Sequence, residues 1–206
     1  MKRILATSVL LAATLASFIS CAETKDTDDH ANWKERNASY ISSIASKCSD
    51  LTPQTAKKGD MFRLLSYNLS KDNDDLGDGS FVYCQVLQKG EGTVSPNFTD
   101  SIRINYRVRL IPTDNYPDGQ VIDRSFMTAK LDPNVNIPSS FKVSSLIEGV
   151  ATAIINMHCG DFWMVYIPYG LGYGSKDKSS IPGYSALIYE INLTEIAVPG
   201  QNLSKR

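Results

Sequence analysis

The feature that most constrains the fold is an alternation of apolar and polar residues between positions 101 and 111. Apolar or aromatic side chains occupy every second position there: Ile102, Ile104, Tyr106, Val108 and Leu110. Successive side chains of a β-strand point to opposite faces of the sheet, so this spacing places all of them on one face. The segment is therefore predicted to be a strand.

The rest of the chain provides further strands and two helices. Strand-like runs occur at 61–65, 81–87, 141–143, 162–167 and 186–196. Helical spacing of apolar residues occurs at 32–47, and the segment 146–157 has room for about three helical turns. Segments rich in Gly, Pro or Asp at 71–79, 112–119 and 170–183 are predicted to be loops. This order predicts an α+β fold, an antiparallel sheet with one short helix late in the chain and a helical N-terminal extension.

Composition argues against several classes of function. Hydrophobic residues make up 42% of the chain and charged residues 21%, as in globular proteins. The net charge of -1 leaves no basic excess to neutralise phosphates, so no nucleic-acid partner is expected. His30 and His158 are the only histidines, which is a poor supply for a metal site or a Ser-His-Asp mechanism. No metal site is predicted.

The first residues predict export. Lys2 and Arg3 precede an uncharged, mostly apolar stretch at 4–19, which is short for a membrane span. The stretch ends before Cys21 and resembles a bacterial lipoprotein signal, in which a cysteine receives lipid after cleavage. Residues 1–20 are therefore predicted to be a signal peptide and Cys21 the lipidation site. The alternative is simple secretion with an incidental cysteine.

Residues 21–31 are predicted to be a lipidated tether. The segment is polar and acidic, which is typical of a solvated linker. Some bacterial lipoproteins carry such a stretch as a signal for the outer surface. The predicted location is the bacterial outer membrane, on its periplasmic or its surface face.

Three further cysteines are Cys48, Cys84 and Cys159. One pair could form a disulfide in an oxidising compartment, or all three could be buried thiols. No CxxC spacing occurs, which argues against a metal or redox motif. We favour buried thiols because Cys84 and Cys159 have apolar or strand-like neighbours.

The region 81–196 contains an ordered series of short motifs that resembles the FKBP-type peptidyl-prolyl isomerase family. The motifs are VLQKGEG at 86–92, INY at 104–106, DGQVIDRS at 118–125, PSSFKV at 138–143, LIEG at 146–149, GDFWMVYIP at 160–168, LGYG at 171–174, IP at 181–182 and ALIYEINL at 186–193. The series is most similar to the exported bacterial subgroup that has a helical N-terminal extension.

The resemblance implies an FKBP-like antiparallel sheet wrapped around a short helix. It implies an N-terminal helix and extension at 32–79, an isomerase domain at 80–197 and a tail at 198–206. It also implies proline-containing polypeptides as partners, no cofactor, and rotation of Xaa-Pro bonds as the reaction. Related exported members dimerise through such N-terminal helices. Here the helix either packs on the domain or self-associates, and a homodimer is left open.

Site residues carried over from the family form one pocket. Tyr106, Asp123, Ile147 and Tyr173 are the predicted catalytic residues: the Tyr173 hydroxyl and the Ile147 backbone N–H would donate to substrate carbonyls, and Asp123 would interact with Tyr106 near the twisted carbonyl. The predicted substrate-binding residues are Ile122, Phe141, Leu146, Val150, Ile181 and Tyr189. Trp163 matches a second position of the subgroup and is predicted to be structural.

Several pocket positions depart from the family pattern. Val150 stands where the family has its floor tryptophan, Ile122 and Tyr189 stand where it has phenylalanines, and Arg124 places a long cation at the rim. An aromatic floor contributes on the order of 150–250 Å² of contact. A weaker grip on proline is therefore expected. An alternative function follows, a binding or chaperone-like module with little or no turnover.

Overall fold

The computed structural model describes residues 28–132 and 135–204. The predicted signal peptide, the predicted lipidation site Cys21 and most of the predicted tether lie outside the described residues. Within the described ranges, no helix combines the length and the apolar character needed to cross a membrane.

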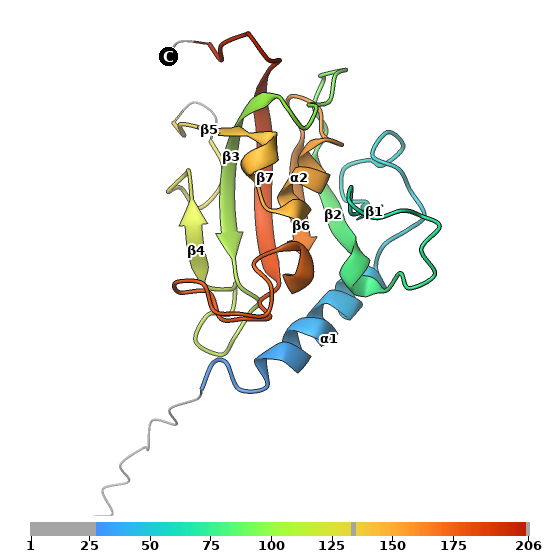
Figure 1. Ribbon diagram of the computed structural model, residues 1–206. Helices are drawn as coiled ribbons and strands as arrows, with labels where there is room; N and C mark the ends of the chain where they lie inside the picture. Colours follow the sequence, from blue (N-terminus) through green and yellow to red (C-terminus); the bar gives the residue numbers. More distant parts are fainter. Residues whose placement is uncertain (1–27, 133–134, 205–206) are drawn as a thin grey trace, which may run out of the picture.

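The core of the molecule is a seven-stranded antiparallel sheet (Figure 1). Its strands run in the order β1-β2-β6-β7-β3-β4, and β5 also pairs with β3. The strands are β1 Met61–Leu65, β2 Phe81–Gln88, β3 Ser101–Arg109, β4 Val121–Arg124, β5 Ser139–Lys142, β6 Phe162–Ile167 and β7 Leu187–Ala197. This sheet and the two helices confirm the predicted α+β class.

Alternation along the strands places the core on one face of the sheet. In β6, Trp163, Val165 and Ile167 are fully buried, whereas the residues between them are half-buried. The Trp163 ring meets the Phe62 ring of β1 edge-on, with centroids 5.3 Å apart. Trp163 thus packs in the core, which agrees with its predicted structural place. The edge strand β1 comes from the segment predicted as the extension, so that segment shares the sheet.

Helix α2, Glu148–Ile154, lies across the core face of the sheet (Figure 1). It is shorter than the three turns predicted for 146–157. Leu146 and Ile147 before it have extended backbone, with ψ of 156° and 150°. After the helix, the Met157 N–H donates to the Ile154 carbonyl, a tighter turn that ends the regular spiral. The apolar residues that suggested a longer helix include Met157, which is buried although it lies in the turn after α2.

The strand β4 was not predicted. Its burial alternates poorly, since three of its four residues are exposed, and an exposed strand gives no periodic apolar signal. It forms because β3 offers a free edge, on which Val108 pairs with Asp123 and Arg107 with Arg124.

Helix α1, Trp33–Ala45, confirms the predicted N-terminal helix and packs on the domain. Trp33, Asn37, Ile41 and Ile44 are buried at 7% exposure or less. Figure 1 shows α1 lying obliquely below the sheet, close to the loop that precedes β7. The sequence left open whether this helix packs on the domain or self-associates, and the structure shows that it packs on the domain. Self-association of the remaining helix surface stays a prediction.

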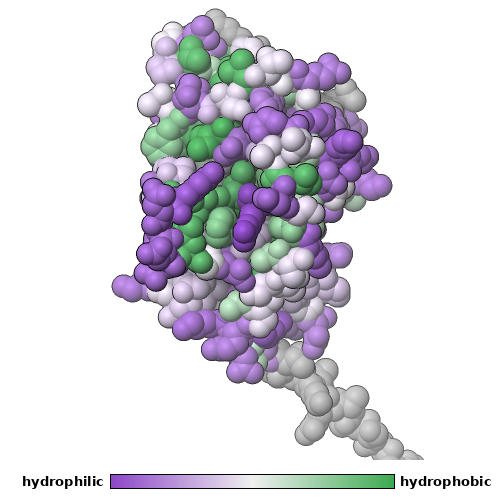
Figure 2. All heavy atoms as spheres, turned by 90° about the vertical axis from the view of Figure 1, so that its right-hand side faces the viewer, coloured by the Kyte–Doolittle hydropathy of each residue, from purple (hydrophilic) through white to green (hydrophobic). Residues whose placement is uncertain are grey.

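Figure 2 shows the side of the molecule on which β1 lies, with hydrophobic residues gathered across its middle and hydrophilic residues around them. The sheet ends at this side with β1. The Ser49 N–H donates to the Met61 carbonyl oxygen across 2.9 Å. The strand edge is therefore partly covered by the segment that follows α1.

The three described cysteines are free thiols. Cys84 is fully buried in β2, and Cys48 and Cys159 are half-buried. Burial raises the pKa of all three thiols, most strongly that of Cys84. The predicted preference for thiols over a disulfide agrees with this arrangement.

Candidate functional site

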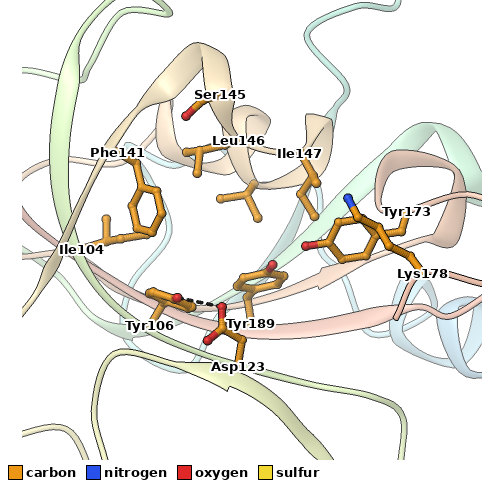
Figure 3. Close-up of a pocket in the computed structure, with 11 residues that line it drawn as sticks. Ile104, Tyr106, Asp123, Phe141, Ser145, Leu146, Ile147, Tyr173, Lys178 and Tyr189 are labelled. Atoms are coloured by element: carbon orange, nitrogen blue, oxygen red, sulfur yellow. Dashed lines mark hydrogen bonds between the residues drawn. The ribbon is translucent and has the colours of Figure 1, made fainter. Parts of the chain in front are cut away.

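A pocket of about 230 Å³ opens between β3, β5, the start of α2 and the loop before β7. Figure 3 shows Phe141 and Ile104 on one side, Tyr173 and Lys178 on the opposite side, and Tyr106 and Tyr189 facing the α2 end. Its lining residues are Ile104, Tyr106, Asp123, Phe141, Ser145, Leu146, Ile147, Val150, Tyr173, Lys178 and Tyr189. All four predicted catalytic residues, and four of the six predicted substrate-binding residues, are therefore brought together.

Strand pairing positions the aromatic wall formed by Tyr106 and Phe141. Both come from neighbouring strands, because β3 pairs with β5 through Ile102 and Phe141. The Tyr106 and Phe141 rings meet edge-on, with centroids 5.8 Å apart. Such pairs contribute about 0.5–1.5 kcal/mol beyond their buried area. The wall is therefore a rigid part of the sheet.

The polar centre of the pocket is a hydrogen bond between Tyr106 and Asp123. The Tyr106 hydroxyl donates to Asp123 Oδ2 across 2.8 Å, and the Arg124 N–H donates to Asp123 Oδ1 across 2.8 Å. On its backbone side, the Tyr106 N–H donates to Ser125 Oγ across 2.8 Å, and the Ser125 N–H donates to the Tyr106 carbonyl oxygen across 2.8 Å. Burial, and then the Asp123 bond, raise the pKa of Tyr106, so this phenol stays protonated at neutral pH.

The α2 end of the pocket is formed by the turn that leads into the helix. Leu146 and Ile147 are half-buried, and Val150 is 2% exposed. Ile147 is the N-cap residue with extended backbone, and among the described residues no acceptor is present for its N–H. This donor at the pocket lining is thus available to a ligand, as the family resemblance implies.

Two further tyrosines, Tyr189 and Tyr173, complete the lining of the pocket. Tyr189 of β7 is 8% exposed, and burial followed by the neighbouring Tyr173 raises its pKa. The Lys178 ammonium lies over the Tyr173 ring at 4.3 Å from its centroid. Tyr173 is thus held between a phenol and a cation, with its hydroxyl directed toward Tyr189 and the cavity in Figure 3.

Ile122 and Ile181 do not line this pocket. They line an adjoining one of about 250 Å³, which shares Asp123, Tyr173, Lys178 and Tyr189 with the first. The predicted set is therefore spread over two recesses that share part of their lining, and the role of Ile122 and Ile181 as walls stays a prediction.

Three lining residues were not predicted: Ile104, Ser145 and Lys178. Ile104 could have been found, because it precedes Tyr106 by two positions on the same strand face. Ser145 lies in a 3₁₀ turn and Lys178 at the tip of a loop, where no periodicity reports the direction of a side chain. Among the described residues, no group of His, Cys, Asp and Glu is suited to hold a metal ion.

An antiparallel sheet with a short helix across it, and an aromatic pocket at the start of that helix, define the class of FKBP-fold proteins. A sequence model of the family described as FKBP-type peptidyl-prolyl cis-trans isomerase matches residues 92–194, half of the chain. The chain therefore belongs to the FKBP-type peptidyl-prolyl cis-trans isomerase family.

Individual relatives agree with this assignment. The chain is 34% identical over 135 residues to the FKBP-type 22 kDa peptidyl-prolyl cis-trans isomerase of Escherichia coli K12, covering 65% of this chain and 58% of that one. It is 33% identical over 113 residues to the peptidyl-prolyl cis-trans isomerase Mip of Coxiella burnetii, covering 54% of this chain and 43% of that one. The chain thus spans about half the length of these curated relatives.

Solved structures share the fold. The crystal structure of FkpA from Escherichia coli matches with a TM-score of 0.54 at 23% identity, covering 82% of this chain and 61% of that one. A peptidyl-prolyl cis-trans isomerase from Pseudomonas syringae pv. tomato matches with a TM-score of 0.54 at 20% identity, covering 82% and 96%. At this identity the likeness concerns the fold alone.

Proposed function

We propose that this chain is a peptidyl-prolyl cis-trans isomerase that acts on Xaa-Pro bonds of exported polypeptides. The observation that carries the proposal is the single pocket in which Tyr106, Asp123, Ile147 and Tyr173 meet. These residues bring two hydroxyl donors, a backbone donor and a carboxylate to a cavity whose other lining residues, apart from Ser145 and Lys178, are apolar or aromatic. No nucleophile is needed for the reaction, because no covalent bond is broken.

The chemistry follows from the resonance of the prolyl amide. Planarity imposes a rotation barrier of about 18–20 kcal/mol. In the twisted state the amide loses resonance and its dipole shrinks, so an apolar pocket stabilises the twisted form relative to the planar one. Preferential binding of the twisted state accelerates the reaction. Phe141 and Leu146 would grip the pyrrolidine ring from two sides.

Hydrogen bonds would fix the flanking chain while the amide rotates. The Ile147 N–H would donate to a substrate carbonyl at the α2 end of the cavity, and the Tyr173 hydroxyl to another on the loop side; both residues line the pocket. The Asp123 carboxylate, oriented by Tyr106, would lie near the carbonyl that turns. Holding both flanks limits the motion to the prolyl bond itself.

Proline-limited refolding tests this proposal. A protein whose slow refolding phase reflects prolyl isomerisation should refold faster in the presence of this chain, because that phase otherwise lasts tens to hundreds of seconds. Tyr173→Phe should lower the acceleration by about threefold to tenfold, the equivalent of one hydrogen bond. An unaltered slow phase at high enzyme concentration would reject the proposal.

Val150 favours a second candidate, a binding module with little turnover. This valine is buried at the pocket lining where the family has an aromatic floor, so apolar contact with proline is reduced. Such a module would bind unfolded chains without accelerating the slow phase. Titration of a permanently unfolded, proline-containing chain separates the candidates, since binding without acceleration supports the second one only.

We further propose that the mature chain is anchored by lipid at Cys21. The charged start, the apolar stretch at 4–19 and the cysteine that follows support this. A relative from Legionella longbeachae, 30% identical over 140 residues, is named outer membrane protein MIP. Labelling with a radioactive fatty acid during expression should mark the natural chain and leave Cys21→Ala unlabelled. Equal labelling of both would contradict the anchor.

A further inference from the structure

Helix α1 is tied to the chain that leads from the pocket loop into β7. Trp33 Nε1 donates to Ser185 Oγ across 2.8 Å, and that hydroxyl donates to the Pro182 carbonyl oxygen across 2.6 Å. Asn37 Oδ1 accepts from the Ala186 N–H across 2.8 Å. Two side chains of one helix therefore hold a short segment that lies about 150 positions later in the sequence.

The polar groups that make these contacts are buried, so they have no water to replace a lost protein partner. Trp33, Asn37 and Ser185 are 7%, 1% and 3% exposed. The Asn37 amide is itself fixed, because Nδ2 donates to the Trp33 carbonyl oxygen across 2.6 Å. A buried polar group that loses its partner costs about 1–3 kcal/mol. Any displacement of residues 182–186 would leave these groups unpaired, so the helix resists it.

The same segment fixes the loop that carries the pocket side chains. The Tyr184 N–H donates to the Gly174 carbonyl oxygen across 3.0 Å, next to Tyr173. At the loop tip, Lys178 and Ile181 exchange two backbone hydrogen bonds of 2.9 and 3.0 Å. The base of the loop is therefore bonded to the residue that follows Tyr173, and the tip is closed by backbone bonds of its own.

A ring contact reinforces the base. The Lys34 ammonium of α1 lies 4.9 Å from the centroid of the Tyr184 ring, whose other neighbour is the Tyr169 ring at 5.0 Å. Tyr184 has a positive φ of 63°, which a bulky residue adopts only when its surroundings impose it. Helix α1 supplies part of those surroundings.

We propose that α1 is a positioning element of the pocket, with Trp33 and Asn37 as positioning residues that hold the 172–186 loop closed against the site. Neither residue lines the pocket, and both lie outside the matched region 92–194. The effect on catalysis rests on the proposed function. The effect on the loop does not.

The test compares Trp33→Phe and Ser185→Ala in the chain lacking residues 1–21, by amide hydrogen exchange and by kcat/KM for a Xaa-Pro peptide. Trp33→Phe keeps an aromatic side chain but removes the N–H donor together with the pyrrole part of the indole. Exchange of the Lys178, Ile181 and Tyr184 amides should accelerate about fivefold, and kcat/KM should fall by a similar factor. The double variant should lose little more than Ser185→Ala alone, because Ser185→Ala already removes the hydrogen bond that Trp33→Phe breaks, together with the bond to the Pro182 carbonyl oxygen.

Ile44→Val is the matched control. Ile44 is buried on the same helix at 4% exposure, and its aliphatic side chain makes no hydrogen bond to the loop. It should lower thermal stability about as much as Trp33→Phe while leaving loop exchange and kcat/KM within about 1.5-fold of the natural chain. Equal acceleration of loop exchange in Ile44→Val and Trp33→Phe would overturn the proposal, and so would unchanged exchange in Trp33→Phe.

The two readouts separate this proposal from the proposed function. If the natural chain does not accelerate prolyl exchange, the proposed function fails, and amide exchange alone still decides whether α1 holds the loop. If the natural chain is active and loop exchange responds to Trp33→Phe without any change in kcat/KM, α1 orders the loop without positioning the pocket, and the proposal fails.

Discussion

The hydrogen bond from the Tyr106 hydroxyl to Asp123 shows how single residues organise the pocket. The two side chains come from adjacent strands, and their 2.8 Å bond, together with the Arg124 N–H bond to Oδ1, fixes the orientation of a carboxylate at an exposed edge. The raised pKa of Tyr106 keeps its proton available for this bond. Each partner thus sets the orientation of the other.

Tyr106→Phe should therefore reduce activity without unfolding the chain. The ring and its edge-on contact with Phe141 remain, while the carboxylate loses one of its two donors and keeps the Arg124 N–H. We expect kcat/KM to fall about threefold to tenfold, the worth of one hydrogen bond. The control is Tyr116→Phe, an exposed tyrosine at 45% exposure outside the pocket. An unchanged kcat/KM in Tyr106→Phe would show that the pair has no part in the reaction.

Single pocket residues were predictable where a motif fixes them and not elsewhere. Tyr106, Asp123 and Tyr173 could be placed because short motifs carry their neighbours in a fixed order. Lys178 could not, because its place over Tyr173 depends on a loop turn in which Ser179 has a φ of 56°. A non-glycine residue with positive φ leaves no reliable trace in a sequence.

At the scale of elements, α2 is held against the sheet by a close approach at Gly149. A Cβ added there would lie 2.3 Å from Cγ2 of Ile167, a β-branched side chain that is fully buried and stiff about its first torsion. The start of α2 also carries the pocket residues Ile147 and Val150. The contact therefore sets the depth of the cavity as well as the packing.

Gly149→Ala should destabilise the fold, although alanine favours helices. Overpacking of a core costs about 1–3 kcal/mol, which exceeds the gain of about 1 kcal/mol in helix propensity. We expect a net loss of about 1 kcal/mol in urea unfolding. Gly77→Ala, where an added Cβ meets nothing within 4 Å, should change stability by less than about 0.5 kcal/mol. A stabilised Gly149→Ala would contradict the close approach.

The outer face of β3 and β7 is joined by ion pairs with little exposure. Glu190 pairs with Arg107 at 2.6 Å and with Arg109 at 3.0 Å, and these three side chains are 11–17% exposed. Glu190→Gln would leave two poorly solvated guanidinium groups without a counter-charge. Unfolding free energy should fall by about 3 kcal/mol, the lower end for a broken buried pair.

Glu195→Gln is the comparison for that substitution. Glu195 pairs with Arg103 at 2.6 Å but is 26% exposed, so water can replace part of the lost interaction. We expect a loss of less than about 1 kcal/mol. Similar losses in Glu190→Gln and Glu195→Gln, measured by urea unfolding at the same pH, would mean that burial does not strengthen the Glu190 pairs.

Elements were predictable in proportion to their burial. The strands β3, β6 and β7 carry regular or continuous apolar residues, and the structure places them at the predicted positions within one or two residues. The strand β4 carries no such pattern, because it is an exposed partner of β3. The length of α2 was overestimated because the buried turns flanking it share its apolar character.

At the scale of the whole molecule, buried tyrosines link folding to alkaline pH. Burial, followed by the neighbouring Tyr166, raises the pKa of Tyr40 to about 12, and burial also raises the pKa values of Tyr83, Tyr106 and Tyr189. The folded chain then holds these protons more tightly than the unfolded chain, whose tyrosines titrate near 10.

The stability that these tyrosine protons contribute should therefore be fully present below about pH 10 and should be lost as the pH rises toward and through about 12. Urea unfolding at a series of pH values would show this decline. Tyr40→Phe should make the decline shallower, because it removes one of the titrating groups. Stability that rises with pH in this range, or identical slopes in both chains, would contradict the assignment.

The extension and the pocket domain form one body, since α1 packs beside the loop before β7 and β1 completes the sheet. Sequence alone could identify α1 by its helical spacing. It could not say where α1 would pack, because the Trp33–Ser185 contact joins segments with no shared periodicity. Long-range polar contacts of this kind become visible only in the folded chain.

Exchange NMR on a short Xaa-Pro peptide tests the central claim, that the pocket lowers the prolyl rotation barrier. The account predicts faster cis/trans exchange with the chain lacking residues 1–21, a fall with Tyr173→Phe, and a rise with Val150→Trp, because an added aromatic floor increases apolar contact. Exchange no faster than in buffer, in the natural chain and in Val150→Trp alike, would contradict it.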